Sequence, residues 1–576
     1  MKRYLLIIIS AAISLLSCVG PKDGVYTFRL LTTNDVHGRY FDSLYVNDNV
    51  NNSLLSVSWY VDSIRVAAGA ENVILVDAGD CLQGDNAAYY YNYVDTESAH
   101  PFVKMIDYIG YDAVVVGNHD IETGHSVYDR IDAQMRTPFL AANAIRTDDG
   151  TPYFQEYVTL KRHGLRLTIL GFTNPNIKSW LSPLLWEGME FKSLLPFVQE
   201  TVDRVVAKEK SDVVIVAVHA GTGEGDGTLL ESQGLDLLNS LKGVDFIVCA
   251  HDHRPLTIIR DSSALINSGS HCRNLGSGTV TVKVENGRVV SKDVSASLIP
   301  LDRTRVDEQM RRIFSKEYEA VKNFTLKEVG QLKCDLHTRE AYRGMSDYVN
   351  LVHAVGLGCK PAQISFAAPL TFNGSIKAGT LVYNDLFTIY PYENQLFVVK
   401  MTGKEIKDYL EYSYGAWINT IKSADERLLR IVNEADPRTG QKNWSFVSRP
   451  YNFDSAAGLD YIVDVTRPVG ERVVIKSLAD GTPFSVEAEY NVAMTSYRAS
   501  GGGGLMRYGA GIDTDKIDGR VVEYYPELRE LIYEYLLKNG EIDPAKIGDP
   551  ALIGHWEFVP ADLASKALDQ DMTLLF

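Results

Sequence analysis

Histidine, aspartate and asparagine side chains follow five separate apolar runs of this 576-residue chain. Each run has the length and composition of a buried strand, and each ends on groups that bind metals or transfer protons. The run ends are Asp35-Val-His37, Asp80, Asn118-His119-Asp120, His219 and His251-Asp-His253. A single histidine at a strand end is most often a capping or core residue. The joint occurrence of all five ends predicts a polynuclear metal centre.

The types of ligand favour borderline-to-hard divalent ions. Histidine, aspartate and asparagine without cysteine suit Zn, Mn, Fe, Co or Ni. The candidate ligands are Asp35, His37, Asp80, Asn118, His219, His251 and His253. These groups are too many for one tetrahedral ion and suit two ions with open positions. Two ions about 3.5–4 Å apart hold the attacking and leaving oxygens of a phosphoryl transfer. They also lower the pKa of a shared water, so that hydroxide is available near neutral pH.

The elements that must position these groups are strands of an α/β (α+β) domain. Ligands bind beyond the carboxyl ends of strands in open α/β sheets, so the five run ends are expected to converge. On an extended backbone, Asp35 and His37 would project to the same side, as would His251 and His253. Asp80 is a lone carboxylate that can bridge two cations. Helical stretches at 54–70 and 194–209, with strand-like runs at 165–171 and 278–284, predict two packed sheets with helices outside.

The run ends resemble the successive sequence blocks of the calcineurin-like metallophosphoesterases, and more narrowly those of the 5′-nucleotidase group. The blocks are Thr33-Asn-Asp-Val-His-Gly38, Asp77-Ala-Gly-Asp80, Gly117-Asn-His-Asp120, His219-Ala220 and Ala250-His-Asp-His253. The resemblance implies an N-terminal β-sandwich flanked by helices. It also implies two metal sites that share the bridging carboxylate of Asp80. The ligands would be Asp35, His37 and His253 for the first metal, and Asn118, His219 and His251 for the second.

The resemblance also assigns catalytic roles. His119 matches the residue that stabilises the transition state and helps the leaving oxygen depart. Glu122 stands where the family usually has an aspartate that orients this histidine, and its side chain is one methylene longer. Ala250 stands where the last block usually begins with glycine, a change that leaves both histidines in place.

Composition and charge restrict the substrate class. The chain is 45% hydrophobic and 23% charged, which is typical of a globular protein, and its length suggests two or more domains. A formal charge of −17 argues against a protein that holds long nucleic acid. Small phosphate substrates remain compatible, because bound divalent ions reverse the local sign. The sequence predicts no obligate protein partner.

The N-terminal segment predicts export. Met1-Lys-Arg precedes an apolar run from Tyr4 to Leu16, which is too short to span a bilayer comfortably and suits a signal peptide. Leu15-Leu-Ser-Cys18 resembles a bacterial lipobox, which implies that Cys18 is lipidated. The lipid would then anchor the protein to a bacterial membrane, on its periplasmic or cell-surface side. The alternative is an ordinary signal peptide with a chance cysteine.

The remaining cysteines are scattered and show no metal-binding spacing, so no disulfide pair can be assigned. Cys81 and Cys249 flank metal blocks. We predict that both are buried small apolar residues rather than ligands.

The chain divides into a signal peptide at 1–18, a metallophosphoesterase domain at 25–300, a linker helix at 301–328 and a second α+β domain at 329–576. The charged segment 307–327 predicts an exposed helix that joins the domains; the alternative is a surface helix of the first domain. The second domain resembles the C-terminal nucleotide-binding domain of the same family. The blocks that carry this resemblance lie at 364–370, 372–376, 383–394, 399–405, 451–454, 461–468 and 495–504.

Aromatic residues of the second domain are candidates for binding a nucleobase. Tyr497 precedes Arg498 and a run of four glycines, and glycines permit close approach and unusual backbone angles. The resemblance implies that two aromatics clamp the base, which would be Tyr497 and Tyr451, with Phe453 as the rival of Tyr451. Arg498 and Asn373 are candidate polar contacts. A nucleotide is then expected to lie between the domains, and the resemblance implies that the second domain rotates to bring it to the metals.

These features predict a two-metal phosphohydrolase that acts on nucleotides, in which a metal-bound hydroxide attacks phosphorus in line. The blocks of the second domain look more like the 2′,3′-cyclic-nucleotide phosphodiesterase/3′-nucleotidase branch than the 5′-nucleotidase branch. A 5′-nucleotidase, or a nucleotide-sugar or dinucleotide hydrolase of the same fold, is the alternative. A surface lipoprotein that binds nucleotides without turnover would need damaged ligands, and a zinc protease would need the His-Glu-x-x-His helix that this sequence lacks.

Overall fold

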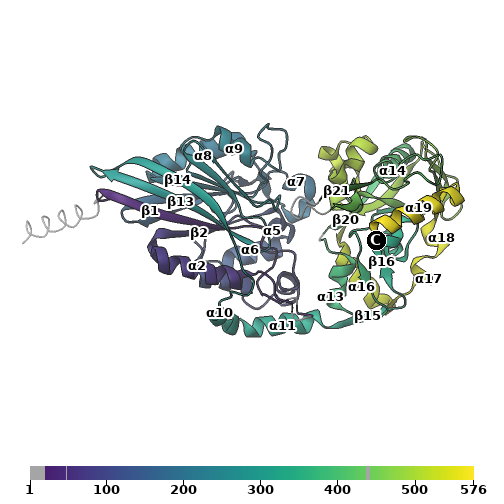
Figure 1. Ribbon diagram of the computed structural model, residues 1–576, viewed down its shortest axis with the longest axis horizontal. Coiled ribbons are helices and arrows are strands. Elements are labelled where there is room, and N and C mark those ends of the chain that lie inside the picture. Colours follow the sequence, from purple (N-terminus) through teal and green to yellow (C-terminus); the bar gives the residue numbers. More distant parts are fainter. Residues whose placement is uncertain (1–19, 44, 47–48, 393, 436–441) are drawn as a thin grey trace, which may run out of the picture. The chain divides into compact units, whose positions relative to one another are not determined.

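Two six-stranded sheets face each other in the first part of the chain. The computed structural model describes residues 20–43, 45–46, 49–392, 394–435 and 442–576 (Figure 1). It separates into one unit that ends at Phe324 and a second that covers Thr325–Phe576. The predicted signal segment and Cys18 lie outside the described residues. Among the residues described, no helix has both the length and the apolar character that crossing a membrane requires.

The first sheet has the strand order β14-β13-β1-β2-β3-β4. Its strands β1 to β4 are parallel neighbours, whereas β13 pairs antiparallel with both β1 and β14. The strands are β1 (Gly24–Thr33), β2 (Val73–Asp77), β3 (Ala113–Val115), β4 (Phe139–Leu140), β13 (Asn274–Glu285) and β14 (Arg288–Pro300).

The second sheet has the order β11-β12-β10-β9-β7-β6. The four central strands are parallel, and an antiparallel strand closes each edge. The strands are β6 (Tyr157–Arg162), β7 (Leu165–Phe172), β9 (Val213–Val218), β10 (Phe246–Cys249), β11 (Leu256–Arg260) and β12 (Ser263–Asn267).

Alternation along each strand explains how the sheets pack. In β1, Leu30 faces the core between the two sheets, whereas Leu31 faces the helices outside. In β2, Ile74 and Leu75 divide in the same way. Strands buried on both faces are continuous apolar runs, which is why β9 is Val-Val-Ile-Val-Ala-Val without a polar residue.

Helices cover the outer face of each sheet, as Figure 1 shows for α2 and for α8 and α9. Ser53 caps α2 by accepting a hydrogen bond from the backbone N–H of Leu55. Lys210, in the left-handed conformation, ends α8. The covering helices include α2 (Leu54–Ala68), α4 (Pro101–Ile109), α6 (His125–Gln134), α8 (Leu194–Glu209) and α9 (Gly234–Ser240). The predicted two-sheet architecture with outer helices is confirmed.

Two helices occupy the charged segment for which one was predicted. These are α10 (Glu308–Ile313) and α11 (Ser315–Thr325), which Phe314 separates. Met310, Phe314 and Val321 are buried in the same core as α2 and α4. The segment therefore packs along its length against the first unit, and the second unit begins at Thr325.

The second unit is built on a five-stranded mixed sheet with the order β23-β17-β26-β20-β27. Its strands are β17 (Ile364–Ala367), β20 (Gln395–Thr402), β23 (Ser455–Ala457), β26 (Glu489–Thr495) and β27 (Val521–Glu527). Helix α14 (Gly403–Trp417) packs on this sheet, where Tyr409 stacks on Phe366 of β17 with ring centroids 4.1 Å apart. Thr402 and Glu405 form a capping box at its start.

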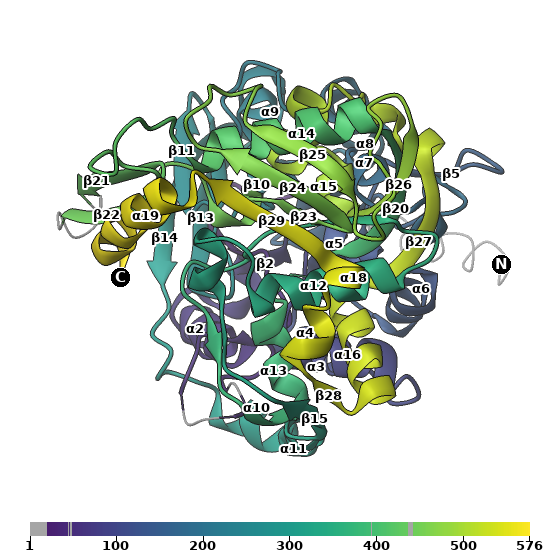
Figure 2. The same cartoon turned by 90° about the vertical axis from the view of Figure 1, so that its right-hand side faces the viewer.

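The C-terminal residues complete sheets rather than forming a separate tail. Strand β29 (Gly554–Val559) runs parallel to β24 (Leu459–Asp464), as Figure 2 shows. Strand β27 lies at the edge of the five-stranded sheet, and α19 (Ala561–Leu575) follows β29. The sequence alone placed the residues after Glu523 only loosely, because these pairings join segments about 100 residues apart.

Candidate metal centre and base-binding residues

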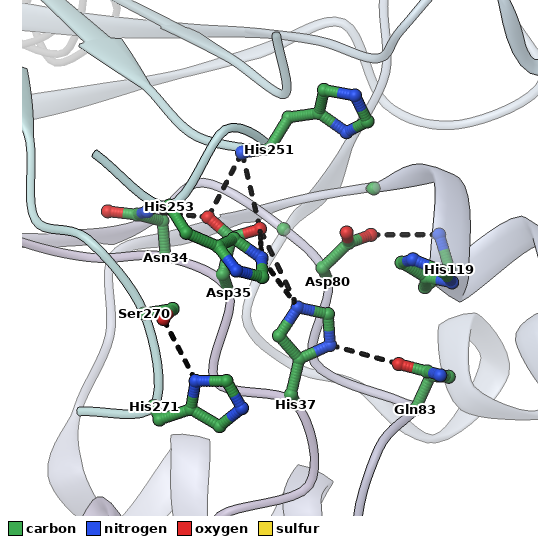
Figure 3. Close-up of polar contacts among 12 residues, drawn as sticks. Asn34, Asp35, His37, Asp80, Gln83, His119, His251, His253, Ser270 and His271 are labelled. Carbon is green, nitrogen blue, oxygen red and sulfur yellow. Dashed lines mark hydrogen bonds and ion pairs between the residues drawn. The ribbon is translucent and has the colours of Figure 1, made fainter. Parts of the chain in front are cut away.

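The predicted ligands follow the carboxyl ends of five strands in the two facing sheets. Asp35 follows β1, Asp80 follows β2 and Asn118 follows β3 in the first sheet. His219 follows β9 in the second sheet, and His251 and His253 follow β10. The structure brings these side chains together, and Figure 3 shows those of Asp35, His37, Asp80, His251 and His253. They form two clusters, one containing Asp35, His37 and His253, the other Asp80, His219 and His251.

The first cluster directs three electron-pair donors at one point. Within it, one ligand atom from each residue lies within 4.8 Å of the others. His37 Nδ1 lies 3.0 Å from Gln83 Oε1 and donates its proton there, so His37 Nε2 carries a lone pair. That Nε2 lies 3.0 Å from Nε2 of His253, which in turn lies 3.3 Å from Oδ1 of Asp35.

The second cluster has the same property. His219 Nδ1 donates to the carbonyl oxygen of Ala78 at 2.8 Å, which fixes the lone pair on Nε2. That buried Nε2 has no hydrogen-bond partner in the described residues, and Oδ2 of Asp80 lies 3.0 Å away. Asn118 Oδ1 lies 2.9 Å from Nδ1 of His251 and adds a fourth donor. Two acceptors that face each other this closely require a cation or a proton between them.

The electrostatics suit a cation. Burial lowers the pKa of His37 to about 4 and, together with nearby His219, the pKa of His251 to about 3, so both imidazoles are neutral. Neutral imidazole and ionised carboxylate are the forms that bind metals. Burial alone would lower the pKa of His219, but the nearby Asp80 carboxylate has a larger opposite effect, and the pKa of His219 rises to about 9. The position beside Asp80 therefore attracts positive charge, and the donor set fits divalent metal ions.

The backbone of the ligand loops differs from the extended form that the sequence predicted. Asp35 and His37 have φ of 50° and 49°, and His251 and His253 have φ of 72° and 56°. These values lie in the left-handed region, which non-glycine residues seldom adopt. The pairs converge because long-range hydrogen bonds bend the loops, such as those from the N–H groups of Asp35 and His37 to the carbonyl oxygens of Gly79 and Asp80. Such strain clusters at functional sites.

Asp120 holds the loop of Asp80 against the helix that carries Asn118. Its buried carboxylate accepts hydrogen bonds from the N–H groups of Gly117 at 2.8 Å, Asp80 at 3.0 Å, and Cys81 and Leu82 at 2.9 Å. A Cβ at Gly117 would lie 2.1 Å from Asp80 Oδ1, so only glycine permits this approach. Sequence reasoning placed Asp120 in a metal block without recognising this role.

His119 lies beside both clusters. Its backbone N–H donates to Oδ1 of Asp80 at 2.8 Å, and its ring meets that of His37 edge-on at 5.5 Å. Glu122 Oε2 lies 2.5 Å from His119 Nδ1, on the next turn of α5 (Asn118–Glu122). The longer side chain of Glu122 therefore reaches the ring that the resemblance assigned to it. One-third of the His119 side chain is exposed, so a bound substrate has access to it.

Sequence reasoning missed His271, which follows β12. Its ring lies 5.3 Å from the ring of His37 and 5.9 Å from that of His253. Its backbone N–H donates to the carbonyl oxygen of Asp35 at 2.8 Å, and its φ is 57°. The pattern that identified the other histidines, a histidine after an apolar strand, is also present here. A short Asn-Ser-Gly-Ser turn joins the apolar strand run Ala264–Ile266 to His271. Gln83, which orients His37, carries no such signal.

In the second unit, Tyr451 and Tyr497 lie side by side. Tyr497 lies in α15 (Ser496–Ala499) with 40% of its surface exposed, and Tyr451 lies in the turn Pro450–Asn452. Their rings meet edge-to-face, with centroids 6.4 Å apart and planes at 81°. Tyr392 continues the row, 6.3 Å from Tyr451 at 75°, and is 40% exposed. Three tyrosine rings thus form an aromatic surface, of which sequence reasoning named two.

The structure corrects the prediction that Phe453 and Arg498 contact the base. Phe453 is fully buried and stacks on Trp417 at 5.5 Å, so it belongs to the core and cannot contact a base. Arg498 is 4% exposed, and its guanidinium binds Asp454 through Nε at 2.9 Å and Nη2 at 2.6 Å. It also donates to the carbonyl oxygen of Tyr451 at 2.7 Å. Arg498 therefore supports the tyrosine loops instead of reaching a ligand.

Asn373 is exposed in the turn before β18 (Ser375–Ile376). Its neighbour Phe372 packs against Phe446 and Phe576. None of the contacts seen among the described residues joins Asn373 to the tyrosine row.

The cysteines are free thiols in the part of the chain that the structure describes. Cys81 and Cys249 are buried, as predicted. The Cys81 thiol donates to Oδ1 of Asp77 at 3.1 Å, and burial together with that carboxylate raises its pKa well above the usual range. A thiol held protonated in this way is a poor metal ligand.

Comparisons with known proteins agree with this geometry. Residues 28–255 match the calcineurin-like phosphoesterase family, and residues 328–509 match the 5′-nucleotidase C-terminal domain. The trifunctional nucleotide phosphoesterase protein YfkN of Bacillus subtilis is 25% identical over 89% of this chain, which spans only 38% of that protein. The 2′,3′-cyclic-nucleotide 2′-phosphodiesterase/3′-nucleotidase of Haemophilus influenzae is 22% identical over 92% of this chain and 87% of its own.

A solved structure shares the fold. The candidate 5′-nucleotidase of Staphylococcus aureus superposes with a TM-score of 0.73 at 20% identity, over 92% of this chain and 99% of its own. A calcineurin-like phosphoesterase domain implies divalent metal ions, and the two clusters of acceptors are the candidate places for them. The predicted family and two-domain fold class are confirmed. The chain belongs to the calcineurin-like metallophosphoesterases that carry a C-terminal 5′-nucleotidase domain.

Proposed function

We propose that the protein hydrolyses phosphate esters of nucleotides with two divalent metal ions, and that 2′,3′-cyclic nucleotides and 3′-nucleotides are its substrates. The observation that carries the proposal is the pair of acceptor clusters in which lone pairs face each other at 3.0 Å. The family assignment and the nucleotide phosphoesterases among the relatives support the substrate class.

The proposed ligands divide between two ions. Asp35, His37 and His253 would hold the first ion, and Asn118, His219 and His251 would hold the second, with Asp80 as a carboxylate ligand that the two ions could share. When bound, the ions supply activated water and neutralise the charge that develops on the phosphoryl oxygens. Zn, Mn, Fe, Co and Ni all suit nitrogen and oxygen ligands of this kind.

His119 is the proposed proton donor to the leaving oxygen. Glu122 accepts a hydrogen bond from Nδ1–H of this ring at 2.5 Å, which directs Nε2 away from the carboxylate. A protonated ring then donates from Nε2 to the alkoxide as the bond to phosphorus breaks, and Glu122 stabilises the charged imidazole before the transfer. The Glu122 side chain is only 7% exposed, so its charge acts in a site with little water.

The tyrosine row of the second unit is the proposed base site. Tyr451 and Tyr497 meet edge-to-face, so one ring must rotate before the two can sandwich a flat base. Gly502 packs directly under the Tyr497 ring, where a Cβ would lie 2.5 Å from ring atoms, so glycine is required for the observed position of the ring. The metal ligands belong to the first unit and the tyrosines to the second, so the proposed activity requires both.

A 5′-nucleotidase is the alternative within the same chemistry, and the S. aureus structure supports the fold for either substrate. A surface protein that binds nucleotides without turnover would need an incomplete ligand set. Each predicted ligand position carries a residue that can bind a metal. Six of the seven side chains lie in the two clusters, and the seventh, Asn118, contacts the second cluster. This complete ligand set disfavours a protein that only binds nucleotides.

We also propose that Cys18 is lipidated and anchors the protein on the periplasmic or cell-surface side of a bacterial membrane. The support is the Leu15-Leu-Ser-Cys18 sequence after a short apolar run. The lipid would be the only membrane contact.

A substrate panel tests the proposed function. The enzyme loaded with Mn²⁺ is expected to release phosphate from 3′-AMP, and from 2′,3′-cyclic AMP by way of 3′-AMP, with higher kcat/KM than from 5′-AMP. Product chromatography distinguishes the ester that is cleaved. A preference for 5′-AMP would establish the 5′-nucleotidase alternative, and no turnover of any nucleotide would refute the proposal.

Removal of the His119 ring tests its role as proton donor. His119→Ala is expected to lower kcat about 10²- to 10⁴-fold, the usual contribution of general acid catalysis, while bound metal stays as in the wild type. Glu122→Gln should cause a smaller loss. His125→Ala removes another histidine paired with a carboxylate, Asp129 at 3.1 Å, and serves as the matched control with unchanged kcat. Loss of metal in His119→Ala would assign this ring to metal binding instead.

Substitution of Tyr497 tests the base site. Stacking on an aromatic ring is worth about 1–3 kcal/mol per base, so Tyr497→Ala should raise KM for nucleotides about 10- to 100-fold. The KM for an aryl phosphate without a nucleobase should not change. Tyr508→Ala is the matched control, since Tyr508 is exposed beside the same glycines. Equal damage to both substrates would contradict base stacking.

Fractionation of cells tests the anchor. Cys18→Ala is expected to move the protein from the membrane fraction to a soluble fraction, because the lipid is the only proposed attachment. Membrane association that persists in this variant would contradict lipidation at Cys18.

A further inference from the structure

Trp180 lies flat against the imidazole of His251. The ring centroids are 5.0 Å apart and the planes make an angle of 15°, which is an offset stack. Trp180 ends the short helix α7 (Ile177–Trp180), after the end of β7, and is half-buried. No motif of the sequence points to it, and it offers no metal ligand.

Two other histidines among the candidate ligands, His37 and His219, are oriented by hydrogen bonds to groups outside the ligand set. His219 donates from Nδ1 to Ala78, and His37 donates from Nδ1 to Gln83, so each ring has a fixed plane and a fixed tautomer. Metal-binding histidines usually have such a partner on the second ring nitrogen. His251 differs. Its Nδ1 faces Asn118, and no hydrogen bond to its Nε2 is seen within the described part of the chain.

The ring of His219 meets the His251 ring edge-on at 5.6 Å, and the stack on Trp180 restrains the plane of the His251 ring from its face. His251 also has a left-handed backbone, with φ of 72°, so its side chain starts from an unusual direction. Its backbone N–H is held by Asp35, at 3.0 Å from Oδ2. That contact fixes the main chain at His251 but does not restrain rotation of the imidazole ring. The group packed against the face of the ring, Trp180, restrains that rotation.

We propose that Trp180 is a positioning residue for the second metal ion, which holds the His251 ring in the plane that metal binding requires. The proposal rests on the two-metal site described above and adds a residue outside the ligand set. A metal withdraws electrons from the imidazole, and an electron-rich indole face attracts the resulting positive charge. The stack is therefore stronger with metal than without it, so Trp180 favours the loaded state.

Trp186 provides a matched control in the same loop. Its Nε1–H donates to the carbonyl oxygen of Leu181 at 3.2 Å, and its ring meets Phe191 edge-on at 6.0 Å. It packs on the loop in a similar way, and none of its contacts among the residues described is with a candidate ligand. Replacing Trp186 therefore perturbs the loop without removing the stack on His251.

The experiment measures metal binding, so it does not depend on activity. Metal-free wild type and the variants Trp180→Phe, Trp180→Leu and Trp186→Leu are titrated with Mn²⁺, and bound ion is followed by calorimetry and electron paramagnetic resonance. Trp180→Leu is expected to weaken one of two sites about 10- to 100-fold, as loss of an orienting partner does. The other site should stay within about twofold of wild type, because its ligands do not contact Trp180. Trp180→Phe, which keeps a ring, should lose less, and Trp186→Leu should bind as the wild type does.

Fluorescence gives a second readout. Co²⁺ bound next to His251 is expected to quench the fluorescence of Trp180. The quenching that accompanies filling of the site at His251 should therefore be smaller in Trp180→Phe, which lacks this tryptophan, than in Trp186→Leu, which keeps it. Wild-type affinity at both sites of Trp180→Leu, or equal weakening of both sites, would overturn the proposal. So would equal losses in Trp186→Leu. A wild-type protein that binds fewer than two ions would instead refute the two-metal site itself.

Discussion

Electron-pair donors that face each other at short distance in the two clusters are the constraint on which the rest of this structure depends. His219 Nε2 and Asp80 Oδ2 are 3.0 Å apart and almost fully buried, and Nε2 of His37 and of His253 are equally close. Burial of such groups without compensation costs several kcal/mol, roughly 2–7 for each polar group. A cation between them turns that cost into attraction. The two clusters are therefore candidate cation sites, and a bound cation would couple the folding of these loops to metal binding.

The fold meets this requirement with rigid strands and strained loops. Parallel strands of two facing sheets end at one edge, which brings five chain segments to one place. Left-handed residues then turn the side chains inward, and Asp120 clamps the Asp80 loop to α5 through four backbone N–H groups. A buried ion pair plays the same part in the second unit, where Arg498 and Asp454 hold the turn of Tyr451. In both units, a buried charged group fixes the conformation of a loop that bears candidate site residues.

The sequence predicts those features of the fold and site that local pattern determines. The run before His219 is a strand because six consecutive apolar residues can be buried on both faces, and the run ends place the ligands. Helix α8 was predicted with its observed bounds because its apolar residues recur at helical spacing.

Long-range contacts decide the remaining features. Phe453 and Tyr451 are equivalent aromatics within one short block, and only the stack on Trp417 shows that Phe453 faces the core. Arg498 finds Asp454 across 44 residues, so its burial could not be inferred from its neighbours. The left-handed turns at Asp35 and His251 depend on hydrogen bonds to distant loops. Trp180 gave no signal because a lone tryptophan in a loop has no characteristic spacing.

Anomalous X-ray diffraction from crystals of the Mn²⁺-loaded protein tests the central claim most directly. The account predicts two anomalous peaks, one enclosed by Asp35, His37 and His253 and one by Asn118, His219 and His251, with the Asp80 carboxylate in contact with both. A single peak, or none at these side chains, would contradict it.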